Sequence, residues 1–166
     1  MLDIIENQPE TIALGQSDFA EVKADAITGH RSLMAKQHFP ANSVICAFHW
    51  ADVFEKPNYL TLQIGDEEHI ELLPTFLECL NHHCAPNCFL DITNKQLIAL
   101  QSIELGDEFT FFYPSAEWDM AQPFDCMCGS TNCIGIVKGA KHLSQSIVTN
   151  YRFTDFIQQK LNQLKY

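Results

Sequence analysis

Three cysteines late in the chain carry the clearest chemical signal. Cys126, Cys128 and Cys133 have the spacing C-x-C-x4-C, and Gly129 and Gly135 allow the backbone to turn around them. Three thiolates within so short a segment suit tetrahedral zinc better than a core strand. A structural zinc ion takes four ligands, so one more must come from a distant segment. The candidates for it are Cys46, Cys79, Cys84, Cys88 and the histidines.

The segment NHHCAPN, residues 81–87, contains one of these candidates and lies between two apolar stretches. Its adjacent histidines, cysteine and proline make a poor helix and a poor strand, so we expect a loop. Cys84 is then better placed for a metal than Cys46, which lies in an apolar, strand-like stretch. Small buried cysteines without a metal are the alternative. A hydrolytic zinc enzyme fits less well, because four cysteine ligands leave no open position for water.

The composition is that of one globular domain. The chain has 166 residues, of which 46% are hydrophobic and 19% charged. No run approaches the roughly 18 apolar residues that a membrane span needs, and the first residues do not form a secretion signal. We therefore expect an intracellular protein, cytoplasmic or, in a eukaryote, also nuclear. There its seven cysteines should be reduced or metal-bound.

The charge is uneven along the chain. The net charge is −11, but residues 141–166 hold four bases and one acid, so this tail is +3 and residues 1–140 carry −14. Such an acidic body disfavours nucleic acid and favours a basic partner, because long-range steering attracts opposite charge. We also expect no membrane partner. Simple solubility is the alternative explanation of the charge.

Short apolar segments separated by turn residues predict a mostly β protein built from hairpins. YLTLQI, residues 59–64, should place Leu60, Leu62 and Ile64 on one face. Pro74 can open a short helix that runs through Leu80. The expected strands are FAEVKA, SLMAK, SVICAF, YLTLQI, HIEL, CFLDI, LIAL and EFTFF.

The clearest helical signal lies at the end of the chain. Apolar residues recur at helical spacing from Ile147 to Leu164 and predict an amphipathic helix. Packing of this helix against its own domain is the main expectation. A homodimer or partner contact through the same face is the alternative.

Four stretches, in this order, resemble the SET-domain protein lysine methyltransferases. They are HRSLMAKQHFPANSVICAF, NHHCAPN, GDEFTFFY and CMCGSTNCIG, and the match covers roughly residues 12 to 140. The resemblance implies a mostly β (α+β) fold, the SET-domain β-clip of small sheets with a pseudoknot, plus a C-terminal helix. It implies a SET domain over residues 1–120, a post-SET zinc segment over 121–140 and a helical extension over 141–166, without a pre-SET region.

The resemblance also implies an activity, which is methyl transfer from S-adenosylmethionine to lysine side chains of a protein. The partner would be a basic, lysine-containing protein or peptide. Tyr113 matches the catalytic tyrosine, and Phe48 and Phe111 match the substrate channel, with Phe109 and Phe112 adding dry walls. The implied cofactor-binding residues are Arg31, Ser32, Leu33, Asn81, His82 and Tyr113. The implied ligands of a structural zinc are Cys84, Cys126, Cys128 and Cys133.

Several positions depart from the family pattern. The Gly-x-Gly of the family falls on His30-Arg31-Ser32, a channel tyrosine becomes Phe48, and the aspartate before the catalytic tyrosine becomes Phe112. These changes motivate an alternative, a catalytically impaired SET-like module for binding or scaffolding. Phe111 stands at the family position that controls product size, where phenylalanine leaves room for more than one methyl group.

Overall fold

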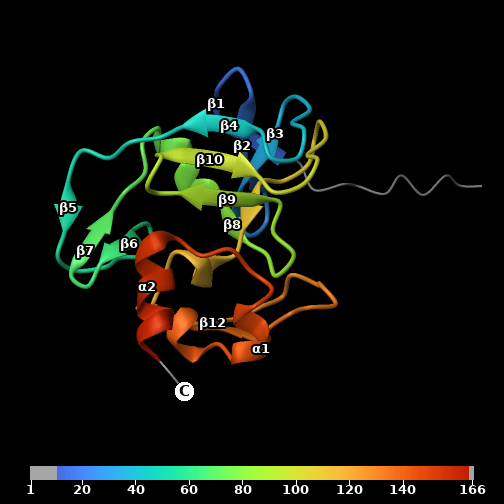
Figure 1. Cartoon of the computed structure of the whole chain (residues 1–166). Helices are drawn as coiled ribbons and strands as arrows, with labels where there is room; N and C mark the ends of the chain where they lie inside the picture. Colours follow the sequence, from blue (N-terminus) through green and yellow to red (C-terminus); the bar gives the residue numbers. More distant parts are fainter. Residues whose placement is uncertain (1–10, 165–166) are drawn as a thin grey trace, which may run out of the picture.

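The chain forms several small β-sheets rather than one large one, as expected from its short strands. The computed structural model describes residues 11–164 and contains five sheets of two or three strands within them (Figure 1). Three sheets are antiparallel triplets, in the orders β1-β2-β3, β4-β10-β9 and β5-β7-β6. Their strands are β1 (Thr11–Gln16), β2 (Ala20–Asp25), β3 (Arg31–Ala35), β4 (Val44–Ala47), β5 (Val53–Phe54), β6 (Leu62–Gly65), β7 (Glu68–Ile70), β9 (Cys88–Asp91) and β10 (Gln96–Ala99).

Two further sheets have two strands each. The strands β8 (Asn81–His82) and β11 (Thr110–Phe111) run parallel, while β12 (Phe124–Asp125) and β13 (Ile136–Val137) are antiparallel. Parallel neighbours cannot be joined by a tight hairpin, so β8 and β11 bring together segments that are distant in the sequence. The helices are short: η1 (Thr75–Cys79), η2 (Tyr113–Ser115), η3 (Ala140–His142), α1 (Gln145–Val148) and α2 (Asp155–Gln163).

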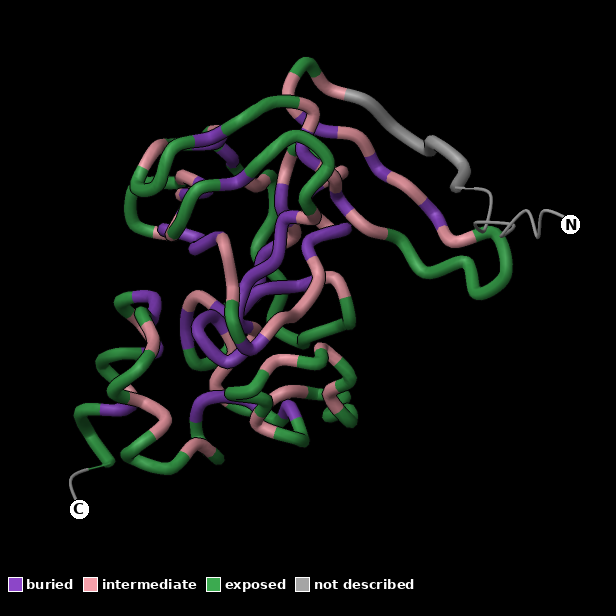
Figure 2. Tube along the Cα trace, turned by 90° about the vertical axis from the view of Figure 1, so that its right-hand side faces the viewer, coloured by how far each residue is buried: buried purple, intermediate pink, exposed green. Residues whose placement is uncertain are grey.

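Two clusters of buried side chains hold these pieces together. The larger lies between the first three sheets and includes Leu33, Leu90, Leu97 and Phe109, none of which is exposed. The smaller cluster joins the C-terminal helices to the residue that follows β11, through side chains that include Phe112 and Ile157. Figure 2 shows buried segments concentrated where the central strands pass one another. The C-terminal helices therefore pack against the chain's own β-structure.

The predicted C-terminal helix is wrong in one respect, because the structure breaks it in two. α1 ends at Val148, and α2 begins only at Asp155. The intervening residues turn inward, where Tyr151 stacks on Phe112 with ring centroids 3.7 Å apart. The spacing of apolar residues continues across this break, so the pattern alone suggested one helix. No helix in residues 11–164 is long and apolar enough to cross a membrane.

Burial over residues 59–64 does not separate the predicted apolar face from the opposite one. Leu60 and Ile64 are half-buried, whereas Thr61 and Gln63 of the opposite face are buried. The reason is a covering segment: the Gln63 side-chain oxygen accepts a hydrogen bond from Trp118 N at 3.0 Å. Both faces of β6 are therefore covered. The short helix expected over residues 74–80 is confirmed as the 3₁₀ helix η1.

Candidate functional site

The parallel pair β8 and β11 brings NHHCAPN against GDEFTFFY. Thr110 lies opposite Asn81 and Phe111 opposite His82. The Asn87 side chain fixes this arrangement: its Nδ2 donates to Glu108 O at 2.8 Å, and its Oδ1 accepts from Thr110 N at 2.8 Å. Both backbone groups are satisfied by one amide, which explains why these very short strands stay paired.

Asn81 connects this pair to the start of β3. Its Nδ2 donates to Arg31 O at 2.8 Å and to Glu108 Oε1 at 2.7 Å, and lies 3.3 Å from Ser32 Oγ. The structure thus brings together three of the predicted cofactor-binding residues. The Leu33 side chain, in contrast, is fully buried in the larger core, so only its backbone can face a ligand.

His82 is a neutral, half-buried link between the strand pair and the cysteines. Burial, with a smaller contribution from neighbouring His83, lowers the pKa of His82 to about 4. Its Nδ1 accepts a hydrogen bond from Tyr113 N at 3.2 Å, so the ring proton is placed on Nε2, 3.3 Å from Cys84 Sγ. One imidazole therefore orients both Tyr113 and Cys84.

The hydroxyl group of Tyr113 is held by the backbone of the residue before β8. It donates to Leu80 O at 3.0 Å. Burial, with smaller contributions from Glu108 and Cys79, raises the pKa of Tyr113 to about 12. The phenol stays protonated at neutral pH, and because its proton is directed to Leu80 O, its oxygen lone pairs are free to accept another donor.

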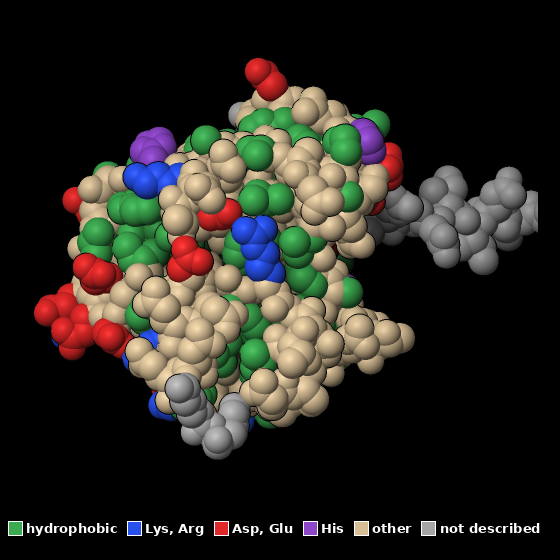
Figure 3. Space-filling view, viewed as in Figure 1, with side chains coloured by type: hydrophobic (Ala, Val, Ile, Leu, Met, Phe, Trp, Pro, Cys, Tyr) green, Lys and Arg blue, Asp and Glu red, His purple; other side chains and the backbone are tan. Residues whose placement is uncertain are grey.

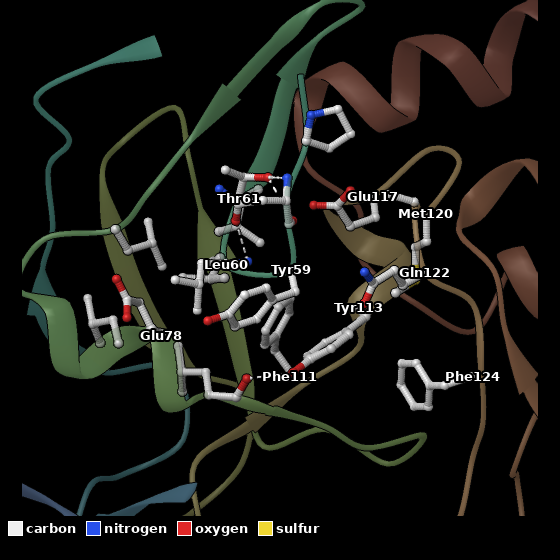
Figure 4. A pocket seen from close by; sticks show the side chains of 18 of the residues that line it. Tyr59, Leu60, Thr61, Glu78, Phe111, Tyr113, Glu117, Met120, Gln122 and Phe124 are labelled. Atoms are coloured by element: carbon white, nitrogen blue, oxygen red, sulfur yellow. Dashed lines mark hydrogen bonds between the residues drawn. The ribbon is translucent and has the colours of Figure 1, made fainter. Parts of the chain in front are cut away.

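Tyr113 lines a cavity of about 370 Å³ (Figure 4). Phe111 forms the adjacent wall, with its ring centroid 4.7 Å from that of Tyr113. Apolar side chains from several other segments complete most of the lining, and its only ionisable groups are two carboxyls and two phenols. The lining includes Tyr59, Leu60, Glu78, Leu80, Phe111, Tyr113, Glu117 and Phe124.

Three predicted wall residues are not on this cavity. Phe48 and Phe109 lie in the larger core, where Phe109 packs edge-on against Phe39, and Phe112 turns to the opposite side and stacks on Tyr151. Alternating side chains of an extended segment point to opposite faces, so Phe111 and Tyr113 face the cavity while Phe112 cannot. Of the expected channel residues, the structure places only Phe111 there.

The four cysteines implicated in metal binding meet beside this cavity. The sulfur atoms of Cys84, Cys126, Cys128 and Cys133 all lie within 4.8 Å of one another. The Cys84 and Cys126 sulfurs are 3.8 Å apart, which matches the edge of a tetrahedron whose Zn–S bonds are about 2.3 Å. The donor set and its size therefore fit a zinc ion. Cys46, Cys79 and Cys88, the other candidates, are not part of the cluster.

Sequence reasoning missed four residues of the site: Tyr59, Glu117, Phe124 and Tyr151. Tyr59 begins a predicted strand and Phe124 lies just before the cysteine motif, so neither had a signal for a cavity, and the tertiary fold brings both to it. Glu117 lies four residues after Tyr113 and has no motif to mark it. Tyr151 falls within the predicted helix, although its hydroxyl donates to Cys84 O at 2.6 Å.

Comparisons with known proteins agree with this geometry. No protein-family model matches the chain. Methyltransferase flvH of Aspergillus flavus is 35% identical over 133 residues, which cover 79% of this chain and 72% of flvH. A histone-lysine N-methyltransferase of Aspergillus oryzae, H3 lysine-4 specific, is 38% identical over 65 residues, which are 35% of this chain and 5% of that enzyme.

A solved structure has a similar fold. The structure of KRYPTONITE in complex with mCHG DNA and SAH superimposes with a TM-score of 0.55 at 24% identity. The match covers 74% of this chain and 30% of that one. Together with the parallel pair and its motifs, these relatives define a class: the chain belongs to the SET-domain methyltransferase family. It spans most of flvH but only a small part of the histone-modifying relative.

Proposed function

We propose that the chain transfers methyl groups from S-adenosylmethionine to the side-chain amine of lysine in a protein substrate. The observation that carries this proposal is the position of the Tyr113 hydroxyl, which lines a largely apolar cavity and is fixed by Leu80 O. The histone-lysine relatives support lysine as the acceptor. The SAH named in the KRYPTONITE structure supports S-adenosylmethionine as the donor.

The junction around Asn81 is the proposed binding site of the donor. When bound, S-adenosylmethionine supplies an electrophilic methyl group on a sulfonium. Its amino-acid end carries an ammonium and a carboxylate, and the junction holds candidate partners for both. The Arg31 guanidinium suits the carboxylate, and the oxygen atoms of Ser32, Asn81 and Glu108 suit the ammonium. His82 and Tyr113 border the same strand pair, and the backbone around Leu33 adjoins it.

The acceptor amine must be neutral and correctly aligned before it can attack. Apolar walls such as Phe111 and Leu60 disfavour the charged form of the amine by desolvation. The Tyr113 oxygen accepts one N–H of the amine, because its own proton is already donated to Leu80 O. The protein thus orients the nucleophile and excludes water without forming a covalent bond.

The charge distribution supports a basic substrate segment. Acidic side chains gather at the edge formed by β5, β6 and β7 (Figure 3), where the exposed turn contributes Asp66 and Glu67. This edge adjoins the cavity through β6, because Leu62 of β6 lines the cavity. A lysine-containing segment that binds beside this sheet as an added strand would meet complementary charge.

The decisive test is transfer of labelled methyl groups from S-adenosylmethionine to basic proteins and peptides. We expect Tyr113→Phe to lower the transfer rate by about 100-fold or more, because the phenol oxygen that aligns the amine is lost. Donor binding, measured by calorimetry, should stay within about threefold of wild type. Mass spectrometry should find di- or trimethyllysine, since Phe111 leaves room in the cavity.

Two outcomes would contradict the proposal. Absence of both transfer and donor binding in the wild-type protein would favour the scaffolding module instead. Full activity in Tyr113→Phe would remove the assigned role of the phenol.

A further inference from the structure

One acidic side chain of the cavity has no role in the mechanism above. Glu117 is half-buried and lines the cavity together with Tyr113 and Phe111. Its Oε1 accepts a hydrogen bond from Gln63 N at 3.1 Å, which fixes the carboxylate against β6. Figure 4 shows this group directed toward the segment of Tyr59 and Thr61, on a different wall from the Tyr113 hydroxyl.

No cation of the protein balances this carboxylate among residues 11–164. None of the ion pairs there involves Glu117, and the cavity lining contains no lysine, arginine or histidine. Lys160 lies over the ring of the neighbouring Trp118 at 5.5 Å, and it pairs with Asp66 instead. A half-buried carboxylate without a cationic partner is costly to ionise, so a cationic ligand gains by supplying one.

We propose that Glu117 is a specificity-determining residue that binds the ammonium group of the substrate as an alkylammonium chain enters the cavity. This inference rests on the proposed function, because it takes the acceptor to be an amine. The apolar walls suit the methylene groups of an alkylammonium chain, and the Glu117 carboxylate suits the ammonium group at its end. The amine is then held as a cation at Glu117 and gives its proton to water before it reaches Tyr113.

The titration of the carboxyl supports this reading. Burial raises the pKa of Glu117 to about 8, and the Gln63 N–H opposes that rise only in part. The other titratable groups on the cavity are Glu78, Tyr59 and Tyr113. Below about pH 8, a cation must displace the proton of Glu117 in order to bind. Above about pH 8, the carboxylate is already ionised and no proton has to be displaced. Alkylammonium affinity should therefore increase with pH in this range.

The test uses n-butylammonium, with 1-butanol as the neutral probe of similar shape, in NMR titrations of the full chain. For the wild type we expect n-butylammonium affinity to rise about 30-fold between about pH 6.5 and about pH 9, because Glu117 ionises over this range while an alkylamine of pKa about 10.4 stays charged. Affinity for 1-butanol should stay flat. Glu117→Gln keeps the acceptor for Gln63 N and should lose both the rise and about tenfold in affinity at the higher pH.

Glu104→Gln is the matched control, since it makes the same substitution at an exposed carboxylate that does not line the cavity. It should behave as wild type, and Glu117→Asp should restore part of the pH dependence. A wild-type affinity that does not change with pH, or a Glu117→Gln variant that binds n-butylammonium as tightly as wild type, would overturn the inference. Neither readout needs methyl transfer, so a failure of the proposed activity is detected separately by the labelling assay.

Discussion

At the scale of single residues, burial sets the protonation of both reactive groups of the cavity. It keeps the Tyr113 phenol protonated, with a pKa of about 12, and it keeps the Glu117 carboxyl protonated to about pH 8. The consequences differ. The phenol never needs to ionise in the proposed mechanism, whereas Glu117 changes charge close to physiological pH.

This pKa has a consequence for stability that Glu117→Gln should reveal. A carboxyl whose folded-state pKa is raised from 4.5 to about 8 stabilises the fold fully below pH 4.5 and loses that contribution as pH rises through 8. We expect Glu117→Gln and wild type to have similar Tm values near pH 5. Near pH 9 the variant should be more stable, by up to about 5 kcal/mol. Calorimetry across this range measures the difference, and a constant difference would show that Glu117 is solvated.

At the scale of elements, the C-terminal segment supports the site from behind. Tyr151, between α1 and α2, stacks on Phe112 at an interplanar angle of 5° and donates to Cys84 O at 2.6 Å. Phe112 directly precedes Tyr113, and Cys84 follows β8 by two residues. A single side chain therefore braces both members of the parallel pair. Phe112, which replaces an aspartate of the family pattern, gains a structural partner in this way.

Substitutions at Tyr151 should separate its two contacts. Tyr151→Phe removes only the hydroxyl group and should cost about 1 kcal/mol, the usual net contribution of one hydrogen bond. Tyr151→Ala also removes the stacked ring and should cost about 3 kcal/mol or more. Urea denaturation followed by circular dichroism measures both values. Tyr59→Phe, whose side chain is 77% exposed, is the control and should leave stability unchanged.

At the scale of the whole molecule, the cysteine cluster joins the segment after β12 to the loop after β8. Cys84 comes from the NHHCAPN loop, while the other three ligands surround the turn between β12 and β13. The β12–β13 pair consists of only two residues on each strand, too few to be stable alone. A zinc ion held by these four thiols would therefore cross-link this segment to the rest of the site.

Removal of the metal should destabilise the whole chain. We expect about one zinc per chain by elemental analysis, and a fall in Tm of about 10 °C or more after treatment with a strong chelator. Cys84→Ser should lower both zinc content and Tm. Retention of one zinc per chain in Cys84→Ser would assign the fourth ligand elsewhere.

How far the sequence could predict this site depends on how local each signal is. The thiol spacing and the polar loop around Cys84 marked the cysteine cluster, because metal ligands constrain nearby residues strongly. The positions of Phe48, Phe109 and Phe112 were not predictable in this way. An aromatic residue in a strand-like segment gives the same sequence pattern whether its side chain faces the core or the cavity. Glu117 acquires its importance only from the residues packed around it. The break between α1 and α2 likewise depends on the contact of Tyr151 with Phe112.

The sulfur distances within the cluster also determine how the protein must be handled. Cys84 and Cys126 have sulfurs 3.8 Å apart, and a small side-chain movement brings them to the covalent length of about 2.05 Å. If the ion is stripped in air, oxygen can couple these thiols into a disulfide, and zinc added afterwards finds two of its ligands blocked. Preparations that lose activity during storage should then recover it with reductant and zinc together, and with neither alone.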